Sequence, residues 1–133
     1  MPGRTLTVRP GALAVARLAP GSPAPAWATG GPAGIVAVVT TAGETSVVCD
    51  AEAVPGGAPV SAGWRALVVA GPLDHGLTGV LASIADPLAD AAVPIFAIST
   101  FDTDWVLVPG DRLDDAVAAL RAAGHRVDDA RGG

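Results

Sequence analysis

The chain has 133 residues, of which 50% are hydrophobic, and its 13 acidic and 8 basic side chains give a net charge of −5. This length fits one compact domain or two very small ones, and the hydrophobic content allows a core without disulfides. The acidic balance and the lack of a Lys/Arg cluster argue against nucleic acid as a partner. The single cysteine, Cys49, cannot form an internal disulfide, which suits a reducing compartment.

A membrane-spanning helix needs about eighteen consecutive apolar residues, and no stretch of that length lacks charged residues, Gly and Pro. We therefore expect no membrane span and no membrane partner. The N-terminal segment MPGRTLTVRPG lacks an apolar signal core after its arginines. The sequence therefore predicts a soluble, cytoplasmic protein.

The first half of the chain alternates short strand patterns with turn signals. GALAVARL (Gly11–Leu18) predicts a strand, and the Pro- and Gly-rich loop after it allows at most one helical turn near Trp27. GIVAVVTT (Gly34–Thr41) predicts a buried strand from its β-branched content, and TSVVCD (Thr45–Asp50) completes a hairpin. One short helical turn is expected in the segment AEAVPGGAP that follows.

The second half begins with a predicted strand, WRALVVAG (Trp64–Gly71), and continues into a helix. Apolar residues recur at helical spacing over about Gly76 to Ala91, at Leu77, Val80, Leu81, Ile84 and Leu88. Pro87 lies inside this pattern and predicts a kink or a weakened last turn.

Two further strands and a second helix complete the predicted elements. VPIFAIS (Val93–Ser99) and DWVLV (Asp104–Val108) read as strands joined by TFDT. Asp111 is the expected cap of a helix that ends at Gly124, with an apolar stripe at Leu113, Ala116, Val117 and Leu120. HRV (His125–Val127) is expected to form the closing strand.

The second half therefore predicts the order β–α–β–β–α–β, which is that of a ferredoxin-like split βαβ unit. The first half is a shortened version of it. We expect an α+β fold with two ferredoxin-like units, residues 1–62 and 63–133, whose antiparallel sheets lie side by side.

Polar groups concentrate in the turn GPLDHGLTG between the predicted strand and helix. The backbone amides of Gly76, Leu77 and Thr78 would begin the helix and suit a carboxylate, and Asp74 would accept a hydrogen bond from an ammonium. The alternative is purely structural, because Asp74 would also serve as a cap and the glycines as turn residues.

The second polar turn, STFDTD, joins two apolar strands. It supplies hydroxyls and carboxylates from Ser99, Thr100, Asp102, Thr103 and Asp104. In a split βαβ unit this turn approaches a neighbouring unit's helix start, so the two turns together predict a small-molecule pocket. The alternative is a polar hairpin turn without a ligand, since Asp and Thr are favoured in turns.

Other reactive side chains do not form a recognisable set. His75 would tune ligand charge near neutral pH, although an exposed turn histidine is the favoured interpretation, and His125 is expected to be solvated. Cys49 is expected to be buried and inert. No metal site, catalytic set or cofactor-binding loop is recognisable. Trp27, Trp64 and Trp105 are assigned to core or interface positions.

The stretch LTGVLASIADPLADAAVPIFAISTFDTDWVLV resembles the ACT domain family. The similarity extends to small tandem-ACT bacterial proteins related to CASTOR arginine sensors and to the regulatory domains of aspartate kinases. It is strong from Gly63 to Val127 and weaker in the N-terminal half. The resemblance implies two ACT units and a homodimer.

The resemblance also implies a regulatory function: a non-catalytic protein without a cofactor that binds an amino acid at an interface between ACT units. It assigns ligand contacts to Asp104, Thr100 and Ile98, with Ser99 beside them and Asp102 as a further candidate. Two alternatives remain: a protein–protein interaction module that binds no ligand, and a small enzyme that uses the acidic residues.

Overall fold

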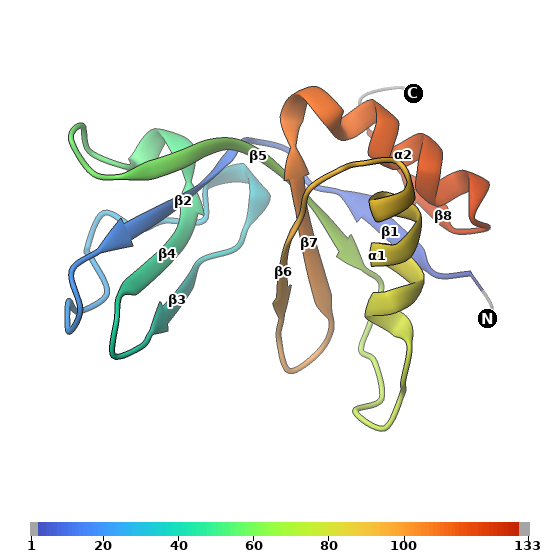
Figure 1. The fold of residues 1–133 in the computed structure, drawn as a ribbon, viewed down its shortest axis with the longest axis horizontal. Helices are drawn as coiled ribbons and strands as arrows, with labels where there is room; N and C mark the ends of the chain where they lie inside the picture. The colour runs from blue at the N-terminus through green and yellow to red at the C-terminus, as the bar shows by residue number, and fades with distance from the viewer. Residues whose placement is uncertain (1–2, 131–133) are drawn as a thin grey trace. The chain divides into compact units, whose positions relative to one another are not determined.

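The computed structural model describes residues 3–130 and contains eight strands, two α-helices and three 3-10 turns. Figure 1 shows the elements in chain order. The strands are β1 (Thr5–Val8), β2 (Leu13–Leu18), β3 (Ala37–Thr40), β4 (Thr45–Asp50), β5 (Val60–Val69), β6 (Phe96–Ser99), β7 (Asp104–Pro109) and β8 (Arg126–Asp128). The helices are α1 (Val80–Asp90) and α2 (Leu113–Ala122), and the 3-10 turns are Gly31–Ala33, Ala51–Ala53 and Gly110–Arg112.

The described residues form two compact units, one made of residues 10–64 and the other of residues 3–9 together with 65–130. Strand β5 continues from the first unit into the second, because its residues lie on both sides of position 64. Residues 3–9 therefore group with the later part of the chain.

The unit of residues 3–9 and 65–130 has the predicted order β5–α1–β6–β7–α2–β8 with one strand added. Its sheet order is β6-β7-β5-β1-β8, so β1 lies between the first and last strands of the split βαβ unit. Strand β1 is antiparallel to β5 and parallel to β8. The α+β, ferredoxin-like fold class is confirmed, and β1 is the element that the sequence reading missed.

Both helices pack on one face of this sheet and form its core with residues from β1, β5, β7 and β8. The predicted stripe of α2 is confirmed, because Leu113, Ala116, Val117 and Leu120 are all buried. For α1, Val80, Ile84 and Leu88 are buried, whereas Leu77 and Leu81 are exposed by 46% and 37%. The prediction that α1 begins at Gly76 is wrong, since the helix begins four residues later.

Helix α2 ends in a Schellman motif, as the sequence predicted from Gly124. Gly124 has φ 97°, its amide donates to the Arg121 carbonyl at 3.0 Å, and the His125 amide donates to Leu120 at 3.0 Å. The predicted cap Asp111 instead lies in a 3-10 turn, and no side chain caps the start of α2.

Helix α1 ends in the same motif, but an alanine occupies the left-handed position. Ala92 has φ 58°, its amide donates to Ala89 at 2.9 Å, and the Val93 amide donates to Leu88 at 2.9 Å. Arg112 lies at this helix end and donates to the carbonyls of Ala91 and Ala92 at 3.0 and 3.1 Å. Its charge also favours the negative end of the helix dipole.

Replacing Ala92 by Gly is expected to raise the free energy of unfolding by about 0.5–1 kcal/mol. The left-handed conformation strains the folded protein at any residue with a Cβ, and removing this strain outweighs the backbone entropy that Gly loses on folding. Urea denaturation measures the change. Ala91 is the matched control, since its φ of −85° is right-handed, and Ala91→Gly is expected to destabilise the protein. Equal effects at the two positions would contradict this account.

His125 is buried, with 7% exposure, and the prediction that it is solvated is wrong. The Arg4 amide donates to Nδ1 at 2.9 Å, and Nε2 lies 2.8 Å from the Ser83 carbonyl oxygen. An amide only donates and a carbonyl only accepts, so the imidazole is neutral and carries its proton on Nε2. Ser83 lies four residues before Pro87, which has no amide to offer this carbonyl. His125 supplies the missing donor, and α1 continues through Pro87 to Asp90.

The unit of residues 10–64 has the sheet order β3-β4-β2-β5. Its small core contains Ala16, Val47 and Cys49, against which Trp27 packs. Burial raises the pKa of the Cys49 thiol, and the charge of Asp50 adds to this effect. Strand β3 was predicted to be buried, but it lies at the edge of the sheet and is largely exposed. A run of β-branched residues is compatible with a buried strand and with an exposed edge strand, so the sequence pattern does not distinguish them.

Candidate functional site

The loop between β5 and α1 is held by its own hydrogen bonds rather than by the helix. The Gly76 amide donates to Asp74 Oδ1 at 2.7 Å, and the Leu77 amide donates to the Asp74 carbonyl at 3.1 Å. The prediction that these two amides form the helix start is therefore corrected. The cap of α1 is Gly79, in a left-handed conformation, and Val80 begins the helix.

The turn between β6 and β7 closes on itself through two threonines. The Thr100 amide donates to the Thr103 carbonyl at 2.8 Å, and the Thr103 amide donates to Thr100 Oγ1 at 3.2 Å. Thr103 Oγ1 also donates to the Val69 carbonyl at 2.6 Å, which anchors the turn to the end of β5.

These two segments lie side by side. The Leu73 amide donates to the Asp102 carbonyl at 2.7 Å, and His75 Nε2 lies 2.6 Å from the Phe101 carbonyl oxygen. The His75 and Phe101 rings also meet edge to face, with centroids 4.6 Å apart. A Cβ added at Gly71 would lie 2.9 Å from the Asp102 carbonyl oxygen. The close approach of the two segments therefore depends on a glycine at position 71.

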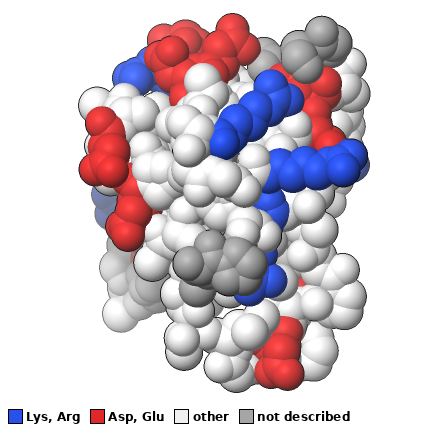
Figure 2. Space-filling model, turned by 90° about the vertical axis from the view of Figure 1, so that its right-hand side faces the viewer, with Lys and Arg blue, Asp and Glu red and all other residues white. Residues whose placement is uncertain are grey.

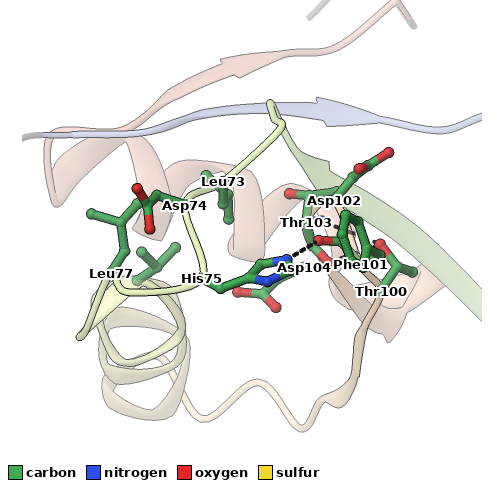
Figure 3. Close-up of a pocket in the computed structure, with 10 residues that line it drawn as sticks. Leu73, Asp74, His75, Leu77, Thr100, Phe101, Asp102, Thr103 and Asp104 are labelled. Atoms are coloured by element: carbon green, nitrogen blue, oxygen red, sulfur yellow. Dashed lines mark hydrogen bonds between the residues drawn. The ribbon is translucent and has the colours of Figure 1, made fainter.

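A pocket of about 160 Å³ opens between the two segments. Figure 3 shows His75 reaching from the loop that carries Asp74 and Leu77 toward the turn that carries Phe101 and Asp102. The lining residues are Leu73, Asp74, His75, Leu77, Val80, Thr100, Phe101, Asp102, Thr103 and Asp104.

Four of the predicted ligand contacts line this pocket: Asp74, Leu77, Thr100 and Asp104. Gly76 and Thr78 belong to the same loop but are not part of the lining. Ile98 and Ser99 lie in β6, opposite Trp105 and Asp104.

The sequence reading gave no role to Phe101 and assigned His75 to an exposed turn. The signal available in the sequence was an aromatic residue within the polar turn STFDTD, and the structure leaves Phe101 82% exposed.

The charged side chains of the pocket are acidic. Asp74, Asp102 and Asp104 line it, and no Lys or Arg is among its lining residues. Asp104 Oδ1 accepts from Ser99 Oγ at 2.6 Å and Asp74 Oδ1 accepts from Gly76, so each carboxylate has a second oxygen that can accept from a ligand. This arrangement suits an ammonium or another cationic donor.

On the face shown in Figure 2, Arg side chains are bordered by Asp and Glu side chains and by uncharged surface. Among residues 3–130, no group of three His, Cys, Asp or Glu side chains is arranged to hold a metal ion. In the same range, none of the helices has the length and apolarity that a membrane span requires.

A split βαβ sheet with two helices on one face is the architecture of an ACT domain. Residues 60–122 match the family model described as ACT domain, so this part of the chain is an ACT domain. Residues 11–57 match a second family model, which describes an N-terminal domain.

Two proteins are similar to the chain in sequence. It is 34% identical to protein Atu0741 of Agrobacterium tumefaciens, whose crystal structure aligns over 97% of this chain and 95% of that chain with a TM-score of 0.90. It is 39% identical over 59 residues to the human cytosolic arginine sensor for mTORC1 subunit 1, covering 44% of this chain but only 18% of the sensor.

The ligand-free regulatory subunit of aspartate kinase from Thermus thermophilus aligns over 86% of this chain and 93% of that chain, with a TM-score of 0.61 and 12% identity. At that identity the likeness concerns the fold alone.

Proposed function

We propose that the protein is a non-catalytic regulatory ACT protein that binds an amino acid in the pocket between the residue 73–77 loop and the residue 100–104 turn. The observation that carries the proposal is the convergence of these two polar segments on one pocket. The similarity to an arginine sensor supports an amino acid as the ligand class.

The chemistry of the pocket fits both ends of an amino acid. The ammonium would donate to the free carboxylate oxygens of Asp74 and Asp104. The carboxylate would accept from backbone amides in the first turn of α1, where Val80 lines the pocket, because the first amides of a helix have no partner within it. Without a basic side chain in the lining, these amides are the site's suitable donors for an anion.

The mouth of the pocket suggests that a second ACT unit covers the ligand. Leu77 and Phe101 line the pocket and are 46% and 82% exposed. Burying such apolar side chains against another copy of the chain would stabilise a homodimer, and a ligand between the copies would favour that arrangement by mass action. Dimerisation linked to ligand binding is thus the proposed regulatory output.

Asp104→Asn is expected to abolish the stabilisation that the cognate amino acid gives. At a ligand concentration of about ten times the dissociation constant, the free energy of unfolding of the wild type would rise by about 1.4 kcal/mol and its Tm by about 3–6 °C. Asn keeps an acceptor for Ser99 but loses the charge that attracts an ammonium. A thermal-shift panel of the standard amino acids at millimolar concentration measures the effect.

Asp86→Asn is the matched control, because it removes the same charge from an exposed position of α1 outside the pocket. It should leave the ligand-induced shift unchanged. A panel without any shift would support the alternative, an interaction module whose exposed Phe101 contacts a partner protein. A shift that survives Asp104→Asn in full would place the ligand elsewhere.

A further inference from the structure

One edge of the sheet in the unit of residues 10–64 lacks a neighbouring strand. Among the described residues, β3 pairs with β4 alone, with Val38 opposite Val47 and Thr40 opposite Thr45. The Thr41 amide donates across this hairpin to the Glu44 carbonyl at 2.9 Å. Because inward and outward groups alternate along an antiparallel strand, the amides of Ala37 and Val39 point toward β4. Those of Val36, Val38 and Thr40 therefore point away from the sheet.

Three valines at this edge are exposed, and they lie on both faces of the sheet. Val38 and Val39 point to opposite faces of the sheet and are 36% and 57% exposed, and Val36, just before β3, is 44% exposed. Natural edge strands are usually protected by Lys, Pro or a bulge. Residues 36–41 contain neither Lys nor Pro, and β3 keeps a regular register with β4. The edge thus has the features of a strand that pairs with another chain.

Charge favours a second copy of this chain as the occupant. The net charge of −5 makes two copies repel each other. Residues 18–43, however, contain no charged side chain, and β3 lies within this stretch. The edge is therefore a place where two copies can approach without bringing like charges together.

We propose that β3 is a self-association surface at which two copies pair antiparallel about a two-fold axis. The outward groups place Val38 opposite its own copy at the axis and Val36 opposite Thr40 of the other copy, which forms about six backbone hydrogen bonds. The exposed valines then lie next to one another across the new strand pair. An antiparallel edge is self-complementary under a two-fold axis, so the interface needs no other segment.

The pairing is tested on the full chain by sedimentation equilibrium over a range of protein concentrations. Val38→Pro removes an outward amide while leaving the amides that face β4, and Val39→Lys places like charges beside each other across the axis. Both variants should weaken association at least tenfold. Val39→Thr, which is β-branched and uncharged, should associate like the wild type.

Circular dichroism checks that each variant is folded. If Val38→Pro does not fold, the association of Val39→Lys alone tests the proposal. A wild type that stays a single chain at all concentrations would overturn the proposal, as would folded variants that associate as strongly as the wild type. Phe101→Ser separates this surface from the pocket mouth, because β3 pairing should survive it. The amino-acid thermal shift should also survive Val39→Lys, because no residue of β3 lines the pocket.

Discussion

Replacement of Leu88 by Ala is expected to lower the free energy of unfolding by about 2–5 kcal/mol, which is the range for leucines that leave a cavity in a packed core. Leu88 is fully buried on the inner face of α1, in the core that both helices share with the sheet. The loss combines the removed apolar contact with a space that the neighbouring side chains fill only in part. Urea denaturation followed by circular dichroism gives the value.

Leu81 provides the matched control on the same helix. It lies two turns before Leu88 and is 37% exposed, so Leu81→Ala removes the same atoms without opening a cavity. We expect a change within about 0.5 kcal/mol for this variant. Similar losses in the free energy of unfolding at Leu81 and Leu88 would contradict the assignment of Leu88 to the buried face of α1.

His125→Ala is expected to cost about 2–4 kcal/mol, because it leaves two backbone groups without their partner. The Arg4 amide loses its acceptor, and the Ser83 carbonyl loses the donor that Pro87 cannot replace. Chemical denaturation again measures the loss. A cost below about 0.5 kcal/mol would show that water serves both groups equally well.

Pro87→Ala turns this contact into a double-mutant cycle. An alanine at position 87 restores the helix amide that faces the Ser83 carbonyl, so His125→Ala should be less harmful in the Pro87→Ala background than in the wild type. We expect a coupling of about 1 kcal/mol between the two positions. Additive effects would separate the histidine from the proline.

The strongest sequence patterns predicted the elements on which the fold depends. The α2 stripe was confirmed residue by residue, since an apolar 3.6-residue period leaves one buried face. Strand β4 was predicted at its observed bounds because a turn signal precedes it. Strand β1 was missed because four residues, TLTV, give too short an alternation, and its place between β5 and β8 is a tertiary property.

The start of α1 was misassigned for a local reason. Leu77 continues the helical period, so periodicity alone extends the helix to Gly76. In the structure Asp74 caps a tight turn with its side chain, and Gly79 adopts a left-handed conformation that separates this turn from the helix. Competing turn chemistry therefore outweighs the apolar pattern.

The polar residues of the candidate site could be predicted because the order of a split βαβ unit suggests which turns meet. The closure of the pocket could not. His75 and Phe101 are far apart in the sequence, and their contact depends on how closely the two segments approach at Gly71. Burial of His125 likewise depends on a carbonyl that only the folded helix presents.

The position of β1 sets an order of assembly. It is the earliest strand of the described chain, yet its partners β5 and β8 form near the middle and at the end of it. During synthesis β1 therefore remains without its parallel neighbour until residues 126–128 are available. Such long-range pairing slows folding, so this sheet can close only after nearly the whole described chain has been made.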